Sequence, residues 1–432
     1  MNAIRAALLI AVGAPALARA QTAPDSLRLS TVRVAAASGD PRLAQLELLA
    51  SQSALRIRNI NTELRPSLSL DGLAQYQSDV AGLNVDLPGI KLPKPANDTY
   101  DAKFGALQRI YDPSIRPRRA AEQAQLAESR ARVKSAIYSL NETVNSAFFI
   151  ALRSQTQIAE LETTARDLEA QIAVAESRIR AGTALQSESS TLRAELLRRR
   201  QSIAEQRAAQ TAAIAILVDL TGRKIDQNIP IAIPDLQSAV AEARSAGTSL
   251  RARPEYEQFE SARNLLVLTD IVRSAQQKPR LSAFGHVGYG RPGLNPLSDK
   301  FDTYWLSGLQ FQWTPWTWGN SSRGRQITAL QRQIVSTEEQ AFTAQLQRSI
   351  EQDIASIDRL ESTLADDDQI ISLRESILAE AKSRYREAVI TSAEYVDRQT
   401  DVLSARLARA IHRVELAQAR ARLLTTLGME VR

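Results

Sequence analysis

The most extended hydrophobic pattern in this chain lies in a stretch from Arg325 to Leu427 that contains no glycine and no proline. Apolar residues recur there in steps of three and four, which places them along one side of an α-helix. These residues are Leu346, Ile350, Ile354, Ile357, Leu360 and Leu364. A helix of even two-thirds of this stretch would be a rod of about 100 Å, at about 1.5 Å per residue. Such a rod needs parallel neighbours, from this chain or from other copies of it, to cover its apolar stripe.

A second pattern, alternation of apolar and polar residues, predicts β-strands. The predicted strands span residues 67–76, 100–110, 281–290 and 304–314. In the second of them Tyr100 and Phe104 share one face, while Asp101 and Lys103 share the other. Each strand therefore has one apolar face and one mixed polar face. A tilted strand needs about 9–11 residues to cross a bilayer, which suits these lengths.

The order of elements occurs twice. The segment from Lys278 to Leu281 corresponds to the segment from Arg65 to Leu68, and Gly428 corresponds to Gly222. This repetition predicts two structural repeats joined by a linker. A predicted signal peptide precedes them. The predicted divisions are residues 1–20 for the signal peptide, 21–222 for the first repeat with a long helix at about 118–181, 223–248 for the linker, and 249–432 for the second repeat with long helices at about 322–427.

The N-terminus is typical of an exported protein. Arg5 gives a positive start, residues 6–12 form a short apolar run, and Ala18-Arg19-Ala20 fits a cleavage site after Ala20. The chain has no cysteine, and no other segment is apolar enough for a transmembrane helix. Any membrane-spanning part must then be a β-barrel, because a closed barrel also satisfies its backbone in lipid. Arginines are spread among glutamates rather than clustered with aromatic residues, so no nucleic-acid partner is expected.

The positions of the aromatic residues favour a membrane location for the strands. Trp305 and Trp313 lie on the apolar face eight positions apart, which is about 26 Å along a strand and suits the two aromatic girdles of a membrane barrel. The candidate girdle residues are Tyr76, Tyr100, Tyr289, Trp305 and Trp313, and the candidate lumen residues are Lys103, Arg109, Gln310 and Gln312. A soluble sandwich with its core on the apolar face is the alternative. Open strand edges are not tolerated in lipid, so closing a barrel requires further copies of the chain.

The mature chain resembles the TolC-type outer-membrane efflux proteins over essentially its whole length. The resemblance lies in the order and spacing of several short segments. These are Arg65-Pro66-Ser67-Leu68, Ile110-Tyr111-Asp112, Arg180-Ala181-Gly182, Lys278-Pro279-Arg280-Leu281, Arg384-Tyr385-Arg386 and Leu427-Gly428. The sequence departs from the family at Ala388, where the family prefers glycine, and at Trp316-Thr317-Trp318-Gly319, which lacks the usual Asp-Gly-Gly.

The resemblance implies a mainly α-helical protein with a membrane β-barrel portion. A homotrimer would form a twelve-stranded barrel, continued by a periplasmic α-helical tunnel that narrows at its inner end. It also implies location in the cell outer membrane, in contact with its lipid. The implied partners are a periplasmic adaptor protein and an inner-membrane transporter that drives export of drugs, metals or polypeptides. The expected function is a passive exit duct without a cofactor.

Acidic residues after the two inner turns are the candidate gate. Glu188 follows Gly182 by six positions, Glu394 follows Ala388 by six, and Asp397 lies near Glu394 on the same helix face. In the family, acidic residues at the positions of Glu394 and Asp397 face the tunnel constriction, and charged rings favour cations in pores. Glu394 also has the spacing of a capping box with Thr391, so it has an alternative role in starting a helix.

Other polar residues give weaker signals. The run Asp366-Asp367-Asp368 is expected on a solvated helix face, His286 in the lumen and His412 on a helix surface. Two isolated histidines and no cysteine leave little material for a transition-metal site. No motif for a catalytic nucleophile or a phosphate-binding loop is present, so no enzyme activity is expected. The alternative to a duct is an exported coiled-coil scaffold that binds partners and conducts nothing.

Overall fold

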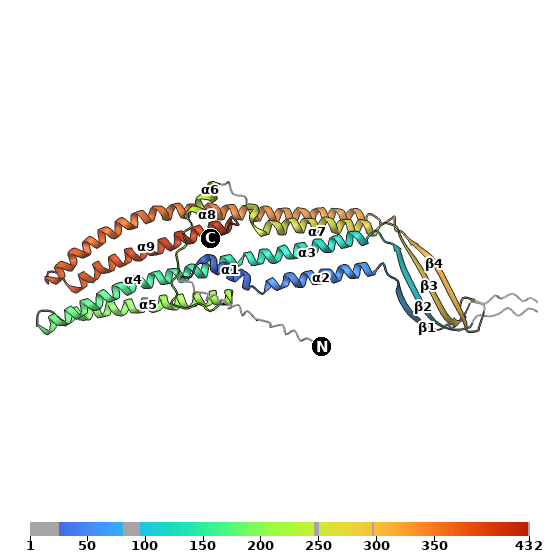
Figure 1. The fold of residues 1–432 in the computed structure, drawn as a ribbon, viewed down its shortest axis with the longest axis horizontal. Coiled ribbons are helices and arrows are strands. Elements are labelled where there is room, and N and C mark those ends of the chain that lie inside the picture. The colour runs from blue at the N-terminus through green and yellow to red at the C-terminus, as the bar shows by residue number, and fades with distance from the viewer. Residues whose placement is uncertain (1–25, 81–95, 246–249, 296–297, 431–432) are drawn as a thin grey trace, which may run out of the picture.

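The computed structural model describes residues 26–80, 96–245, 250–295 and 298–430. The molecule is elongated, with helices over most of its length and a β-sheet at one end (Figure 1). The predicted signal peptide with its cleavage site at Ala20 lies outside the described residues.

The elements follow one another in two similar series, each with a β-hairpin followed by long helices. In chain order they are α1 (Leu29–Gly39), α2 (Arg42–Thr62), β1 (Ser67–Tyr76), β2 (Asp98–Tyr111), α3 (Ile115–Tyr138), α4 (Leu140–Arg180), α5 (Gln186–Thr221), α6 (Gln237–Ser245), a 3₁₀ turn (Leu250–Ala252), α7 (Pro254–Gln276), β3 (Arg280–Arg291), β4 (Asp302–Gln312), α8 (Asn320–Arg386) and α9 (Ser392–Thr426).

The strands form an antiparallel sheet in the order β1-β2-β3-β4, which leaves β1 and β4 as the edges in the described residues. The register pairs Leu70 with Phe104, Phe104 with Val287, and Val287 with Trp305. Because side chains alternate along a strand, these residues share one face of the sheet. The alternation in the sequence therefore predicts the two faces correctly.

The helices form two hairpins, α4–α5 and α8–α9, at the end of the molecule opposite the sheet (Figure 1). Two apolar cores hold them together. The first lies where α1, α4, α5, α6, α8 and α9 meet and includes Phe148, Leu217 and Leu360, and the second lies nearer the hairpin tips and includes Leu168 and Leu403. Within the described residues, no helix combines the length and the low charge needed to cross a membrane.

The predicted helix at about 118–181 is interrupted, because α3 ends at Tyr138 and α4 begins at Leu140. No glycine or proline marks this point. The Ser139 hydroxyl donates to the carbonyl oxygen of Ala136 at 2.8 Å, and serine side chains that bond to nearby backbone compete with the helix. The Tyr138 hydroxyl donates to the carbonyl oxygen of Thr425 at 2.6 Å, which ties the interruption to the end of α9.

The expectation for residues 366–368 is wrong in part. Asp367 is buried and its Oδ2 lies 2.6 Å from Nδ1 of His412, while Asp368 pairs with Arg409. Helices α8 and α9 run side by side as one hairpin, so α9 covers this face of α8. His412 is correspondingly part of the contact between the two helices rather than a free surface residue.

Candidate functional site

The two hairpin turns have the same backbone geometry. Gly182 and Ala388 both adopt a left-handed conformation, with φ of 75° and 60°. The backbone amide of Thr183 donates a hydrogen bond to the carbonyl oxygen of Arg178 at 2.9 Å. The backbone amide of Val389 donates in the same way to the carbonyl oxygen of Arg384, also at 2.9 Å. An L-residue in this conformation costs about 1–2 kcal/mol relative to glycine. The departure from the family at Ala388 therefore leaves the turn unchanged but strains its backbone.

Tyr385 joins the two hairpins near their tips. Its side chain is 2% exposed and stacks on Tyr395, with ring centroids 5.1 Å apart. The Arg178 guanidinium lies 5.8 Å from the centroid of the Tyr385 ring, and the Tyr385 hydroxyl donates to Oε2 of Glu188 at 3.3 Å. Burial, and then the nearby Glu188 carboxylate, raise the pKa of Tyr385 to about 12. Tyr385 therefore stays protonated and remains a hydrogen-bond donor at neutral pH.

The predicted gate residues do not form a single cluster within one chain. Glu188 is half-buried against Tyr385, whereas Glu394 and Asp397 are exposed near the start of α9. Among the described residues, neither the Glu394 nor the Asp397 carboxylate has an ion-pair partner. These two carboxylates are therefore available to an ion or to another protein.

A capping box between Thr391 and Glu394 has two hydrogen bonds, and the structure shows one of them. The Thr391 hydroxyl accepts a hydrogen bond from the backbone amide of Glu394 at 3.2 Å, which caps α9. This bond uses the amide and not the carboxylate of Glu394. Thr391 therefore caps the helix whatever the charge at position 394, and a pore role for that charge is compatible with the cap.

The candidate girdle residues lie at both ends of the sheet. Tyr100 pairs with Ala74 and Tyr289 pairs with Ala102, so both lie on the apolar face at the end far from the helices. The rings of Tyr100 and Tyr289 both stack on Phe301, with centroids 6.0 and 5.5 Å away. The other candidates follow the same rule. Tyr76 and Trp305 lie toward that end, and Trp313 follows β4 at the helix end.

The candidate lumen residues lie on the opposite face, together with aromatic residues that the alternation did not single out. The register brings Lys103 opposite Gly288 and places Gln310 and Gln312 on the same face. On that face the rings of His286 and Tyr304 lie 6.1 Å apart. The face is therefore polar at its ends and partly aromatic in its middle.

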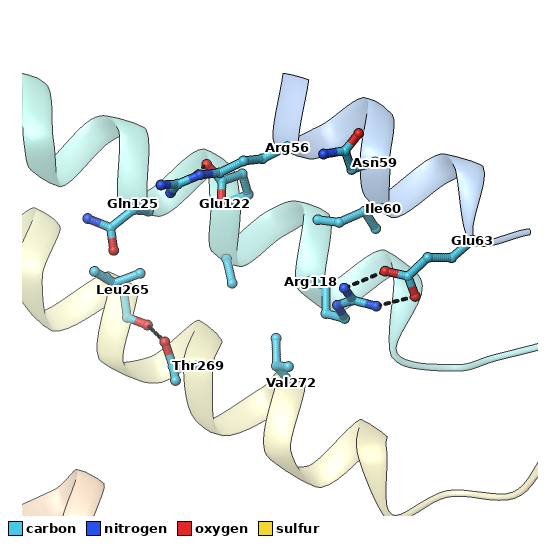
Figure 2. A pocket seen from close by; sticks show the side chains of 11 residues that line it. Arg56, Asn59, Ile60, Glu63, Arg118, Glu122, Gln125, Leu265, Thr269 and Val272 are labelled. Carbon is cyan, nitrogen blue, oxygen red and sulfur yellow. Dashed lines mark hydrogen bonds and ion pairs between the residues drawn. The ribbon is translucent and has the colours of Figure 1, made fainter. Parts of the chain in front are cut away.

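Arg109 has a structural role at the junction of sheet and helices. Figure 2 shows Glu63 at the end of α2 and the bidentate ion pair that it makes with Arg118 of α3, at 2.7 and 2.6 Å. Arg109 contacts the same carboxylate, and Asp112 lies 3.6 Å from its guanidinium. The hydrogen bonds and charge of Arg118 outweigh partial burial and lower the pKa of Glu63. The network fixes β2 to α2 and α3.

A groove of about 460 Å³ lies beside this network, between α2, α3 and α7. Its lining residues include Arg56, Ile60, Glu122, Leu265 and Val272. Arg56 and Glu122 face each other across it at 3.6 Å. Over the described parts of the chain, no group of three or more His, Cys, Asp or Glu side chains is arranged to hold a metal ion.

Comparison with solved structures identifies the fold. No family model and no curated protein matches the sequence. The chain is similar to the transmembrane channel CusC, with a TM-score of 0.71, 14% identity, and coverage of 93% of this chain and 92% of that one. The CmeC outer membrane channel of Campylobacter jejuni matches with a TM-score of 0.67 and 15% identity, over 93% of this chain and 85% of that one. The open state of the MtrE outer membrane channel of Neisseria gonorrhoeae matches with a TM-score of 0.66 and 18% identity, over 94% of this chain and 90% of that one.

The similarity extends over nearly the full length of each structure, so it covers the sheet and both helical hairpins together. The chain therefore has the fold of TolC-type outer-membrane channels, as its sequence resemblance predicts.

Proposed function

We propose that the protein is a passive exit duct in the outer membrane, through which an inner-membrane transporter drives export by way of a periplasmic adaptor. The observation that carries this proposal is the arrangement of one protomer. Among the described residues, a sheet with one apolar face and two unpaired edges continues into long helical hairpins that place carboxylates without ion-pair partners at the far end. A sheet of this kind satisfies its backbone in lipid only when other copies close it.

The protein forms a homotrimer under this proposal. The edges β1 and β4 of different copies would pair, and the three copies would complete twelve strands around a lumen. Within each copy the repeats 21–222 and 249–432 contribute one β-hairpin and one helical hairpin each. Exposed apolar side chains on α2 and α8 support association of the helices as well. They are Leu48, Leu55, Ile327, Leu330 and Ile334.

We expect the detergent-purified protein to have the mass of three chains. Pairing of strand edges between copies supplies the hydrogen bonds that one copy cannot make, so the isolated chain should not persist in detergent or lipid. Native mass spectrometry of the full mature chain measures this directly. A folded monomer that is stable in detergent would contradict the barrel.

The Glu394 and Asp397 carboxylates line the inner end of the tunnel in this proposal. Each chain contributes both, so the trimer would bring symmetry-related carboxylates together around one axis. Converging carboxylates attract cations. Glu188 lies next to Tyr385 and contributes to the charge of this end from a partly buried position.

Neutralising both exposed carboxylates tests the duct and its gate together. We expect Glu394→Gln with Asp397→Asn to lower cation preference and to weaken block by multivalent cations in planar-bilayer recordings. The Thr391 cap uses the backbone amide at position 394, so the double variant keeps the start of α9 intact. Unchanged selectivity and unchanged block would remove these residues from the pore.

Glu380→Gln is a suitable matched control. Glu380 lies on α8 near the same tip and pairs with Arg384 at 2.6 Å, so it is already neutralised within the chain. Its removal should alter cation preference far less than the double variant does. The scaffold alternative predicts that neither the wild type nor any variant conducts.

A further inference from the structure

The segment that joins β4 to α8 carries three of the four tryptophans of the chain, Trp313, Trp316 and Trp318. Trp316 is 71% exposed and Trp318 is 82% exposed. The rings of these two residues meet edge to face, with centroids 5.9 Å apart. The two rings therefore contact each other and otherwise remain largely exposed.

The backbone of this segment is strained. Trp318 has a φ of 50° and the following Gly319 a φ of 76°, so two consecutive residues are left-handed. A bulky residue in this region of conformational space costs about 1–3 kcal/mol. The Trp318 ring is exposed, so packing of this side chain into the apolar cores of the described residues does not offset this cost.

The equivalent junction in the first repeat is built differently. There the Asp112 carboxylate accepts hydrogen bonds from the amide and the hydroxyl of Ser114, at 2.9 and 2.7 Å. Arg280 and Arg109 approach the same carboxylate at 3.9 and 3.6 Å. The charge of Asp112 is therefore satisfied within the chain.

The second junction has basic groups in place of this closed network. Arg323 and Arg325 lie in the first turns of α8, and both are exposed. Neither has a carboxylate partner in the part of the chain that the structure describes, although many other arginines do. The guanidinium of Arg323 lies close to Gly319, where an added Cβ would be 3.1 Å from Nη1. Two cations without a carboxylate partner among the described residues therefore follow Trp318 by five and seven positions in the chain.

Exposed tryptophans that are followed in the chain by unpaired arginines favour the headgroup region of a lipid bilayer. Tryptophan favours the headgroup region of a bilayer, where its ring is in an apolar environment and its N–H remains hydrated. Unpaired arginines near that region attract anionic lipid phosphates. The segment also continues from the apolar face of the sheet, where Leu309 and Phe311 are both exposed.

We infer that Trp316, Trp318, Arg323 and Arg325 form a binding surface for anionic phospholipid headgroups, on the side of the membrane that faces the helices. The inference rests on the proposed membrane location of the sheet. It assigns a lipid contact to the segment where the sequence departs from the family pattern, and it accounts for the exposure, the unpaired charges and the strain together.

Depth-dependent fluorescence quenching tests this surface in the full mature chain. The variant Trp305→Phe with Trp313→Phe leaves only Trp316 and Trp318 as reporters, in vesicles of phosphatidylethanolamine and phosphatidylglycerol. We expect stronger quenching by lipids brominated near the headgroup than by lipids brominated near the chain end, together with protection from aqueous iodide. Quenching by iodide alone would place the pair in water. Resistance to both quenchers would show that another protein chain covers it, and either result overturns the inference.

A second variant separates this inference from the proposed function. Trp313→Phe with Trp316→Phe and Trp318→Phe leaves Trp305 as the only reporter, on the apolar face of the sheet. Quenching of Trp305 by brominated lipid with none at the pair contradicts only the headgroup surface. Absence of quenching at Trp305 as well contradicts the membrane location itself.

The arginines supply the preference for negative charge. We expect Arg323→Gln with Arg325→Gln to reduce the difference in quenching between brominated phosphatidylglycerol and brominated phosphatidylethanolamine. One arginine near a membrane surface contributes about 1 kcal/mol, so each loss should lower the preference by up to about fivefold. An unchanged preference would exclude the arginines from the surface. Arg332→Gln, an exposed site further along α8, is the control.

Discussion

Replacing Leu309 with arginine is expected to prevent most of the protein from assembling in the outer membrane, the location that we propose for the sheet. Leu309 is 68% exposed on the apolar face of the sheet and pairs with Ala283 of β3. A basic residue on the lipid-facing side near the middle of a membrane strand costs about 2–4 kcal/mol. The cost applies to every copy in the assembly. The fraction of protein that migrates as a heat-modifiable species in outer-membrane preparations measures the effect.

Gln310→Arg is the matched control, because it makes the neighbouring residue basic on the opposite face. Gln310 pairs with Ser282 and lies on the polar face with Lys103. Its replacement should leave assembly near the wild-type level. Equal defects at positions 309 and 310 would mean that the assignment of the two faces is wrong.

Replacing Tyr385 with alanine is expected to loosen the tips of both helical hairpins. Loss of a large buried aromatic side chain typically costs about 3–5 kcal/mol. Tyr385 contacts Tyr395 of its own hairpin and both Arg178 and Glu188 of the other. We expect limited trypsin digestion of the detergent-purified protein to become much faster at arginines near the turns, with little change near the sheet.

Two further variants refine this prediction. Tyr385→Phe keeps the ring and removes only the hydrogen bond to Glu188, so its cost should be about 1 kcal/mol and its digestion intermediate. Val389→Ala alters an exposed side chain in the adjoining turn and should digest like the wild type. A Tyr385→Ala protein with wild-type digestion would show that the ring does not hold the tips together.

The faces and turns could be predicted from the sequence because they depend on local periodicity. Strand alternation fixes which face Leu70, Phe104 and Trp305 occupy, whatever the neighbouring strands are. The inner turns could be located at Gly182 and at Ala388 from the repeat, but the left-handed geometry at Ala388 could not be predicted, because alanine rarely adopts it. Alternation can be recognised within one short segment, and the repeat can be recognised by comparing two segments of the sequence. Neither requires knowledge of the tertiary structure.

Two of the interactions that the sequence did not reveal join residues far apart in the chain, and a third is local. The contact of Glu188 with Tyr385 and that of His412 with Asp367 both depend on how helices pack side by side. The interruption at Ser139 depends on a hydroxyl that bonds to backbone instead of water. Several of these residues could be singled out by type or spacing, but their contacts could not, because a single sequence does not show which helix faces pack together.

The unpaired edges of the sheet have a consequence for the time course of assembly. Because the outer edges of β1 and β4 have no paired strand among the described residues, closure of the proposed barrel waits for encounters between chains, and its rate rises more steeply than in proportion to their concentration. At low expression each chain would spend longer with open edges, which are templates for unwanted pairing. The balance between completed ducts and aggregates would then be decided by synthesis rate and by chaperones that shield these edges during transit.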